Sequence, residues 1–199
     1  MNKIVKKLAR QNLRKLKSSA VGFIMLGISI GVGYEELVGI GTWHSIRTET
    51  DKVNVCFTPP HGCGSLIAQC IADAKDSIYM QAYSLTSTPI IQQLVKAHKK
   101  GVRVQVLLDK SNLDDKNSGM NELKRAGISV GIDKVSGIAH NKVIIIDKQR
   151  VITGSFNFSK AADYRNAENV VLINDEELAQ YYLKNWQSRR DSNLKTINR

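Results

Sequence analysis

Residues His140–Asn157 read HNKVIIIDKQRVITGSFN, and this stretch decides both the fold class and the chemistry. Lys142–Ile146 is apolar after its first residue, and Arg150–Thr153 follows three polar residues later. We therefore expect two antiparallel strands joined as a hairpin. Because residues i and i+2 of a strand share one face, His140 and Lys142 should point the same way.

The side chains of this stretch suit phosphodiester chemistry. A histidine can act as nucleophile or acid, a lysine supplies a cation, and an amide donates to a phosphate oxygen without adding charge. His140, Lys142 and Asn157 are of these types, and the small pair Gly154-Ser155 leaves room for backbone donors beside an anion. Asp147 at the strand end should fix the hairpin or a neighbouring donor. No cluster with metal-ligand spacing accompanies the set, so we expect hydrolysis without a metal or other cofactor.

The spacing H-x-K-x4-D followed by G-S-x-N resembles the HKD motif of the phospholipase D superfamily. Over residues 53–186 the order of elements resembles that of the small, single-motif, Nuc-type endonucleases. The segments that carry the likeness include SIYMQAYSLTSTPI (77–90), KKGVRVQVLLD (99–109) and YYLKNWQSR (181–189). The resemblance implies a phosphohistidine intermediate and a mainly structural role for Asp147.

The resemblance also implies a carboxylate that orients the catalytic histidine. Glu168 matches that position, and Asp163 is the alternative, although we expect Asp163 to lie on a helix surface. Asn157 on its own would better fit a hydrogen bond in a loop or at the start of the helix expected from Ser159, but its offset from His140 favours a place in the site.

The chain carries one motif. Of the other histidines, only His98 has a lysine two residues on, and the position that needs aspartate is Gln105. If the chemistry needs two histidines, they come from two chains. We therefore expect a homodimer with one shared active site on its twofold axis.

Strand and helix patterns alternate along the rest of the chain, which predicts an α/β sandwich: a mixed, mostly parallel sheet with helices on both faces. We expect strands at 52–57, 77–83, 102–108, 128–132 and 168–173 besides the hairpin. The expected helices span 65–74, 88–100, 120–126, 159–164 and 175–190, with Ser65 and Thr88 as N-caps.

The formal charge of +11 is concentrated at the N-terminus, since residues 1–19 hold seven basic residues and no acid. The rest holds 22 basic and 18 acidic residues, so overall charge is weak evidence for nucleic-acid binding. We divide the chain into a basic leader with an apolar segment (1–33), a linker (34–52), a catalytic domain (53–190) and a polar tail (191–199).

Ala20–Ile30 has eleven residues without charge, which fits a secretory signal better than a full membrane span. We expect an exported protein, periplasmic or attached to a membrane through residues 20–33, with the catalytic domain outside the cytoplasm. A cleaved signal and a retained anchor both remain open. The alternative is a basic amphipathic or disordered leader on a cytosolic protein.

Three cysteines allow two interpretations. Cys56 and Cys63 flank a six-residue loop and could form a disulfide, with Cys70 a small buried apolar residue. A zinc site from these cysteines and His61 is the alternative, but the spacing fits no compact zinc knuckle.

The expected activity is a metal-independent endonuclease on DNA or RNA with little sequence preference. One alternative keeps the chemistry and changes the substrate to phospholipid, as in a phospholipase D. A positive channel would favour nucleic acid and an apolar rim would favour lipid. A third interpretation, a catalytically idle binder of nucleic acid or membrane surface, fits a complete motif poorly.

Overall fold

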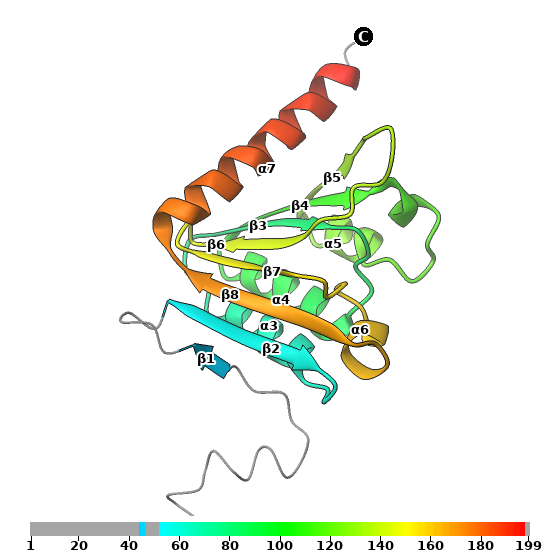
Figure 1. Ribbon diagram of the computed structural model, residues 1–199. Coiled ribbons are helices and arrows are strands. Elements are labelled where there is room, and N and C mark those ends of the chain that lie inside the picture. The colour runs from blue at the N-terminus through cyan, green and yellow to red at the C-terminus, as the bar shows by residue number, and fades with distance from the viewer. Residues whose placement is uncertain (1–43, 47–51, 198–199) are drawn as a thin grey trace, which may run out of the picture. The chain divides into compact units, whose positions relative to one another are not determined.

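A computed structural model describes residues 44–46 and 52–197, with side chains for 52–192. Its strands form one mixed sheet in the order β1-β2-β8-β7-β6-β3-β4-β5 (Figure 1). The strands are β1 (His44–Ile46), β2 (Val53–Thr58), β3 (Ser77–Ala82), β4 (Arg103–Asp109), β5 (Ser129–Asp133), β6 (Lys142–Ile146), β7 (Arg150–Gly154) and β8 (Glu168–Asn174). The helices are α3 (Cys63–Ala72), α4 (Thr88–Lys99), the 3-10 turn η1 (Lys110–Leu113), α5 (Met120–Arg125), α6 (Lys160–Tyr164) and α7 (Glu176–Ile197).

The sheet is mixed as expected, but the expectation of a mostly parallel sheet was wrong. Among the strands that the structure describes, only β3 with β4 and β4 with β5 pair in parallel, and the other five pairings are antiparallel. The connections explain this difference. A parallel neighbour needs a crossover of a dozen or so residues, which α4 and α5 provide. The turn between β6 and β7 spans only 147–149, so the chain must reverse there.

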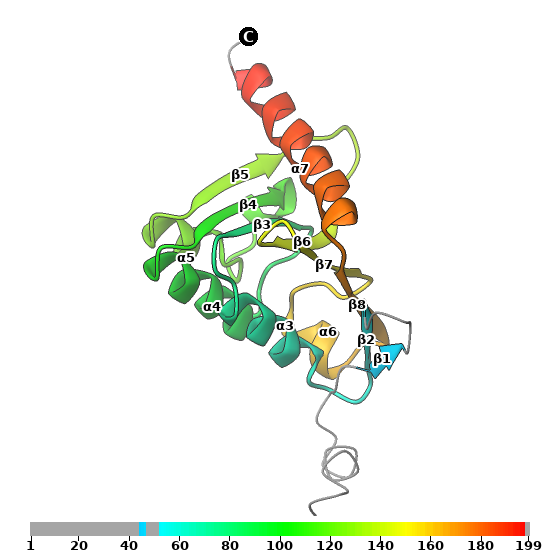
Figure 2. The same cartoon turned by 90° about the vertical axis from the view of Figure 1, so that its left-hand side faces the viewer.

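Helices cover both faces of the sheet, which confirms that part of the prediction. Figure 2 shows α3, α4, α5 and α6 on one side and α7 alone on the other. The larger core lies under the first group and takes the alternate side chains Ile78, Met80, Ile144 and Ile146. A smaller core lies under α7, where Trp186 donates its indole N–H to the carbonyl of Met80 at 2.9 Å.

Two expected N-caps were misplaced, and Asp163 explains one of them. Helix α3 begins at Cys63 rather than Ser65, and Gly62 is its N-cap. The carboxylate of Asp163, 8% exposed, accepts hydrogen bonds from the backbone N–H groups of Gly62 and Gly64 at 2.9 and 3.1 Å. Asp163 is therefore a buried cap supplied from α6, and its expected surface position was wrong.

Helix α4 is capped by Ser87 rather than Thr88, with Pro89 in its first turn as expected. The C-terminal helix α7 continues to Ile197, so most of the expected polar tail is helical. The expected leader and most of the linker lie outside the described residues. Among the described residues, no helix is long and apolar enough to cross a membrane.

Candidate active site

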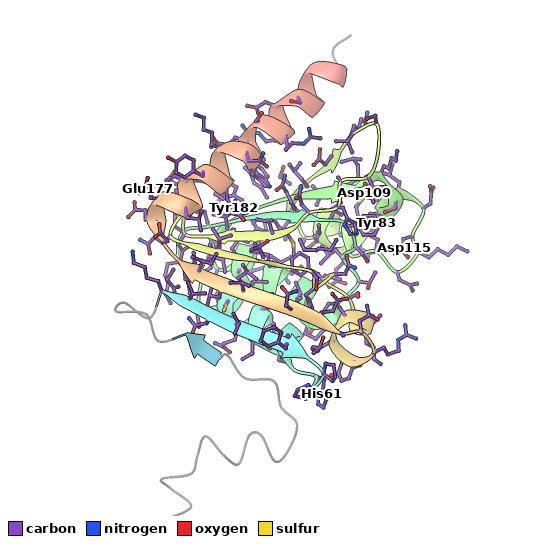
Figure 3. All side chains as sticks on the ribbon, in the orientation of Figure 1. His61, Tyr83, Asp109, Asp115, Glu177 and Tyr182 are labelled. Carbon is purple, nitrogen blue, oxygen red and sulfur yellow. A yellow bond between two sulfur atoms is a disulfide. The ribbon has the colours of Figure 1, made fainter. Side chains whose placement is uncertain are left out.

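The motif residues lie at one end of the sheet, where β2, β3, β4 and β7 finish and β6 and β8 start. The register places Lys142 opposite Ala82 of β3 and Glu168 opposite Thr58 of β2. Figure 3 labels Tyr83 and Asp109 at this end and Glu177 at the far end. Strand polarity thus gathers residues from four separate segments.

His140 and Lys142 meet around the ring of Tyr83. The imidazole of His140 is exposed and packs edge-on against that ring, with centroids 4.7 Å apart. The ammonium of Lys142 lies 5.1 Å from the centroid of the same ring and donates to the carbonyl of His140 at 2.9 Å. A solvent-accessible imidazole therefore stands beside a fixed cation, an arrangement suited to attack on an anionic diester.

Lys142 is buried, with 6% of its surface exposed. Burial lowers the pKa of its ammonium, and the nearby Glu168 carboxylate offsets part of that effect. A cation that has already lost its water interacts more strongly with a phosphate than an exposed lysine does. Lys142 is thus preorganised to bind the charge of the diester.

Asn157 lies three residues beyond the end of β7, in the segment that leads to α6. It is not the cap of α6, because Ser159 occupies that position and accepts from the N–H of Ala162. The side-chain oxygen of Asn157 is buried without a hydrogen-bond partner. A buried acceptor without a partner is costly, so this oxygen needs an O–H or N–H donor, such as water or a hydroxyl of a ligand at the site, whereas a phosphate oxygen could only accept from the NH2 group of the same amide.

Gly154 and Ser155 both contact residues of strand β8. Gly154 has φ of 142°, and a Cβ there would lie 2.3 Å from the carbonyl oxygen of Asn169. The hydroxyl of Ser155 donates to Glu168 at 2.5 Å. We expected the backbone at this pair to approach an anion closely. In this structure the backbone of Gly154 approaches strand β8 instead, and the hydroxyl of Ser155 holds the carboxylate of Glu168.

Glu168 is held by its neighbours. One carboxylate oxygen accepts from Ser155, and the other accepts from the side chain of Asn166 at 2.9 Å. Among the described residues, no hydrogen bond joins Glu168 to the ring of His140. Within one chain, the group with which Glu168 interacts electrostatically is Lys142.

Asp147 lies at the opposite end of β6, about 16 Å from Lys142 at the rise of a strand. Its carboxylate accepts from the backbone N–H groups of Lys75, Asp76 and Ser77 at 2.8–3.1 Å and pairs with Arg150 at 3.5 Å. Burial raises the pKa of this carboxyl, but the backbone hydrogen bonds outweigh burial and lower it overall. The aspartate of the motif ties the hairpin to β3 and does not reach the reacting group.

Two residues of the site were not predicted from the sequence. Tyr83 follows β3 and contacts both motif residues that are placed for chemistry. Asp109, 1% exposed at the end of β4, accepts from the N–H of Ala139 at 2.7 Å and so fixes the segment just before His140. The sequence did contain one signal for Asp109, because this residue is a carboxylate at the end of a strongly apolar strand.

Cys56 and Cys63 form a disulfide between the end of β2 and the start of α3, and Cys70 is free and buried. The zinc alternative loses two of its ligands to this bond. His61 is exposed and stacks on Tyr164 with centroids 5.1 Å apart. No group of three or more histidine, cysteine or carboxylate side chains in the described part of the chain is placed to hold a metal.

The chain is similar in sequence and fold to known proteins. Residues 67–190 match the family described as "Cardiolipin synthase, PLD-like domain". A protein named phospholipase D from Rickettsia bellii is 50% identical over 196 residues, 90% of this chain and 97% of that protein. Another of that name from Rickettsia felis is 60% identical over 142 residues, 71% of each chain. The crystal structure of Nuc, a phospholipase D family member from Salmonella typhimurium, has a TM-score of 0.67 and 41% identity, and covers 70% of this chain and 93% of its own.

The fold and the site define a phosphodiesterase of the phospholipase D type. The chain belongs to the phospholipase D superfamily, in the family described as "Cardiolipin synthase, PLD-like domain".

Proposed function

We propose that this phosphodiesterase hydrolyses phospholipid head groups at a membrane surface. The observation that carries the proposal is the surface around His140. Three large apolar side chains in segments that follow strands at the active-site end, one each in η1, in the loop before β6 and in α6, are more than half exposed: Leu113 (55%), Ile138 (57%) and Tyr164 (59%). We call these three residues the apolar rim. Ile138 stands two residues before His140, so this member of the rim lies next to the reacting group in the chain.

These segments and the loops next to them are basic. Their exposed basic side chains are Lys110, Lys116, Lys134, Lys160 and Arg165, against the exposed acids Asp114 and Asp115. Apolar side chains interspersed with cations suit the interface of an anionic bilayer, where the former enter the acyl boundary and the latter meet the phosphates. The names of the two Rickettsia relatives agree with a phospholipid substrate.

We propose that catalysis proceeds through a phosphohistidine. A neutral ring nitrogen of His140 attacks phosphorus, a P–N bond forms, and the bond from phosphorus to the head-group oxygen breaks. The leaving oxygen takes a proton from an imidazolium. Water then attacks phosphorus and gives its proton to the resulting imidazole, and the P–N bond breaks. The ammonium of Lys142 and the side-chain NH2 group of Asn157 would donate hydrogen bonds to the non-bridging oxygens in both steps.

The imidazolium must come from a second histidine, and the chain has one motif. We propose that His140 of the partner subunit supplies it in a twofold homodimer. The exposure of His140 supports this proposal, because a buried ring could not face its copy across an axis. Nothing in these steps uses a metal, so turnover should continue in EDTA. Loss of turnover in EDTA and its return with added metal would rule the mechanism out.

We propose that the catalytic domain works outside the cytoplasm. The basic and apolar pattern of residues 1–33 supports this, and so does the Cys56–Cys63 disulfide, since disulfides persist in oxidising compartments. Fractionation of cells that express the full chain would test it. Recovery of the reduced protein in the cytosol alone would contradict the proposal.

The second candidate is nuclease activity, which the five basic side chains favour. Both candidates can be tested in one experiment with the full chain and His140→Ala. Each protein receives phosphatidylcholine vesicles, plasmid DNA and RNA in EDTA. We expect choline release that the variant lacks. Cleavage of DNA or RNA without choline release would replace the lipid proposal with the nuclease.

The apolar rim has its own test. Full burial of a Leu or Ile side chain contributes about 1.5–3 kcal/mol, so burial of a half-exposed one contributes about 1 kcal/mol, or roughly a fivefold change in affinity. Ile138→Ser and Leu113→Ser should each weaken vesicle binding by about that factor. Tyr181→Ser is the matched control, because Tyr181 is 66% exposed but lies on α7. Equal losses of vesicle affinity in all three variants would contradict a role of the apolar rim in membrane binding.

A further inference from the structure

We propose a second phosphate-binding site, separate from the catalytic residues, in a pocket at the N-terminus of α4. The pocket has a volume of about 310 Å³, at the small end of the range for ligand sites. It lies where the starts of α3, α4 and α6 converge. Its lining residues are Ser65, Thr86, Ser87, Thr88, Pro89, Lys160, Asp163 and Tyr164.

The N-terminus of α4 is not neutralised by the fold. The first turn of this twelve-residue helix contains no acidic residue, and its N-cap, Ser87, makes no side-chain capping bond. Pro89 has no N–H and the N–H of Ile91 bonds the carbonyl of Ser87, so the N–H groups of Thr88 and Ile90 and the positive end of the helix dipole remain for an anion. Helix α3 differs, because the carboxylate of Asp163 already caps it.

Ser87 is the independent observation that points to a ligand. It is 7% exposed, and its hydroxyl has no hydrogen-bond partner among the described residues. The hydroxyl oxygen itself retains some accessible surface, so water or a ligand is the partner available to it. Its backbone N–H is fixed by the carbonyl of Phe158 at 2.8 Å, so the residue itself is held in place. Since Ser87 lines the pocket, its free hydroxyl is available to a ligand there.

The chemistry of the lining suits a phosphate. Lys160 supplies a cation, and Thr86 and Thr88 add hydroxyls beside Ser87. Asp163 is the one acid in the lining, and the N–H groups at the start of α3 hold its charge. A tetrahedral anion can accept several hydrogen bonds at once from such a set.

The pocket is close to both the catalytic residues and the apolar rim. Thr86 is three residues beyond Tyr83, and Lys160 is three residues beyond Asn157, which places each within about 11 Å of its catalytic neighbour. Tyr164 belongs to both the rim and the pocket. We therefore assign the ligand as the phosphate of a neighbouring lipid in the same bilayer. That choice of lipid rests on the proposed function, whereas the phosphate site does not.

The test uses the full chain with His140→Ala and Lys142→Met, so that the catalytic residues bind little phosphate. Inorganic phosphate is titrated by calorimetry into this protein and into the same protein with Ser87→Ala or Lys160→Gln. Ser87→Ala removes no hydrogen bond of the described fold, so it should not unfold the chain. We expect one saturable site per chain, weakened at least tenfold by either change. Lys116→Gln, an exposed lysine in another loop of the same end, should change affinity less than twofold.

The second arm identifies the source of the phosphate. The same proteins are sedimented with vesicles of phosphatidylcholine alone or mixed with phosphatidylglycerol, and a short single-stranded oligonucleotide is offered as a competitor for inorganic phosphate. We expect Ser87→Ala and Lys160→Gln to weaken binding to the mixed vesicles. The absence of saturable phosphate binding would overturn the site. Competition by the oligonucleotide with unchanged vesicle binding would overturn the lipid assignment. Phosphate binding in a protein that hydrolyses no lipid would leave the site standing and remove only the proposed function.

Discussion

Replacement of Asp147 by alanine should separate stability from chemistry. The carboxylate accepts backbone N–H groups from three consecutive residues, and its side chain is 12% exposed. A hydrogen bond to a charged group contributes about 1.5–3 kcal/mol, and neighbouring bonds to one carboxylate are not additive. We expect the free energy of unfolding to fall by about 3 kcal/mol, and Tm to fall by roughly 6–12 °C for a chain of this size.

The pH dependence of this effect has a definite sign. The pKa of Asp147 is lowered in the folded chain, because hydrogen bonds from the N–H groups of Asp76, Ser77 and Lys75 outweigh burial. A lowered carboxyl pKa gives stability that is fully present above the unfolded value of about 4 and is lost as pH falls through the folded value. The difference between wild type and Asp147→Ala should therefore shrink in acid.

Urea unfolding at several pH values measures the stability term, and turnover of a soluble phosphodiester at low temperature measures the chemistry. Asp147→Asn retains one acceptor oxygen and should lose about half as much stability. Turnover per folded molecule should change by less than threefold in both variants. A hundredfold loss of turnover in a fully folded Asp147→Asn protein would refute the structural role.

Three further predictions follow from the site. Lys142→Met removes a buried cation, so turnover should fall by at least a hundredfold. The free energy of unfolding, measured in urea, should rise by up to about 1 kcal/mol, because the buried charge is costly. A marked loss of stability would contradict this reasoning about burial. Glu168→Gln removes a negative charge that raises the pKa of Lys142, so the alkaline limb of the pH profile of kcat/KM should move to lower pH. A shift to higher pH would exclude the interaction between Glu168 and Lys142. Reduction of Cys56–Cys63 opens a loop of about eight residues and should cost about 2.5 kcal/mol of stability; an unchanged Tm in reductant would argue against the bond.

Much of the site could be predicted from the sequence because its residues are close together in the chain. A period-two pattern predicts the hairpin and places His140 and Lys142 on one face of a strand. The motif itself indicates the superfamily. The structural role of Asp147 also followed from its place at the strand end. Its acceptor partners could not be predicted, because Lys75–Ser77 lie 70 residues away and meet it only through the pairing of β3 with β6.

The errors share a physical cause. The parallel sheet was expected from the alternation of strands and helices. Strand direction depends instead on whether each connection crosses the sheet: β6 and β7 are joined by a short turn, and β7 and β8 pair antiparallel although α6 lies between them. Asp163 was assigned to the surface because its helix pattern alone does not reveal that α3 begins beside it. A cap supplied from another element leaves no local signal in the sequence.

The proposal of a lipid substrate likewise depends on the fold. Leu113, Ile138 and Tyr164 are isolated apolar residues in three different segments, and the sequence alone gives none of them a role. Strand polarity places these three segments at one end of the sheet, and the structure shows that the three side chains are exposed there. The same polarity brings Tyr83 to the ring of His140.

The covalent step on His140 is the central claim, and one measurement tests it most directly. The full chain is mixed with phosphatidylcholine vesicles in EDTA, quenched in alkali within a single turnover, and mapped by mass spectrometry. The account predicts a phosphatidyl group on the peptide that contains His140, at up to one per two chains, and no adduct or choline release in His140→Ala. Choline release by wild type with the adduct on another residue, or by the His140→Ala variant, would contradict it.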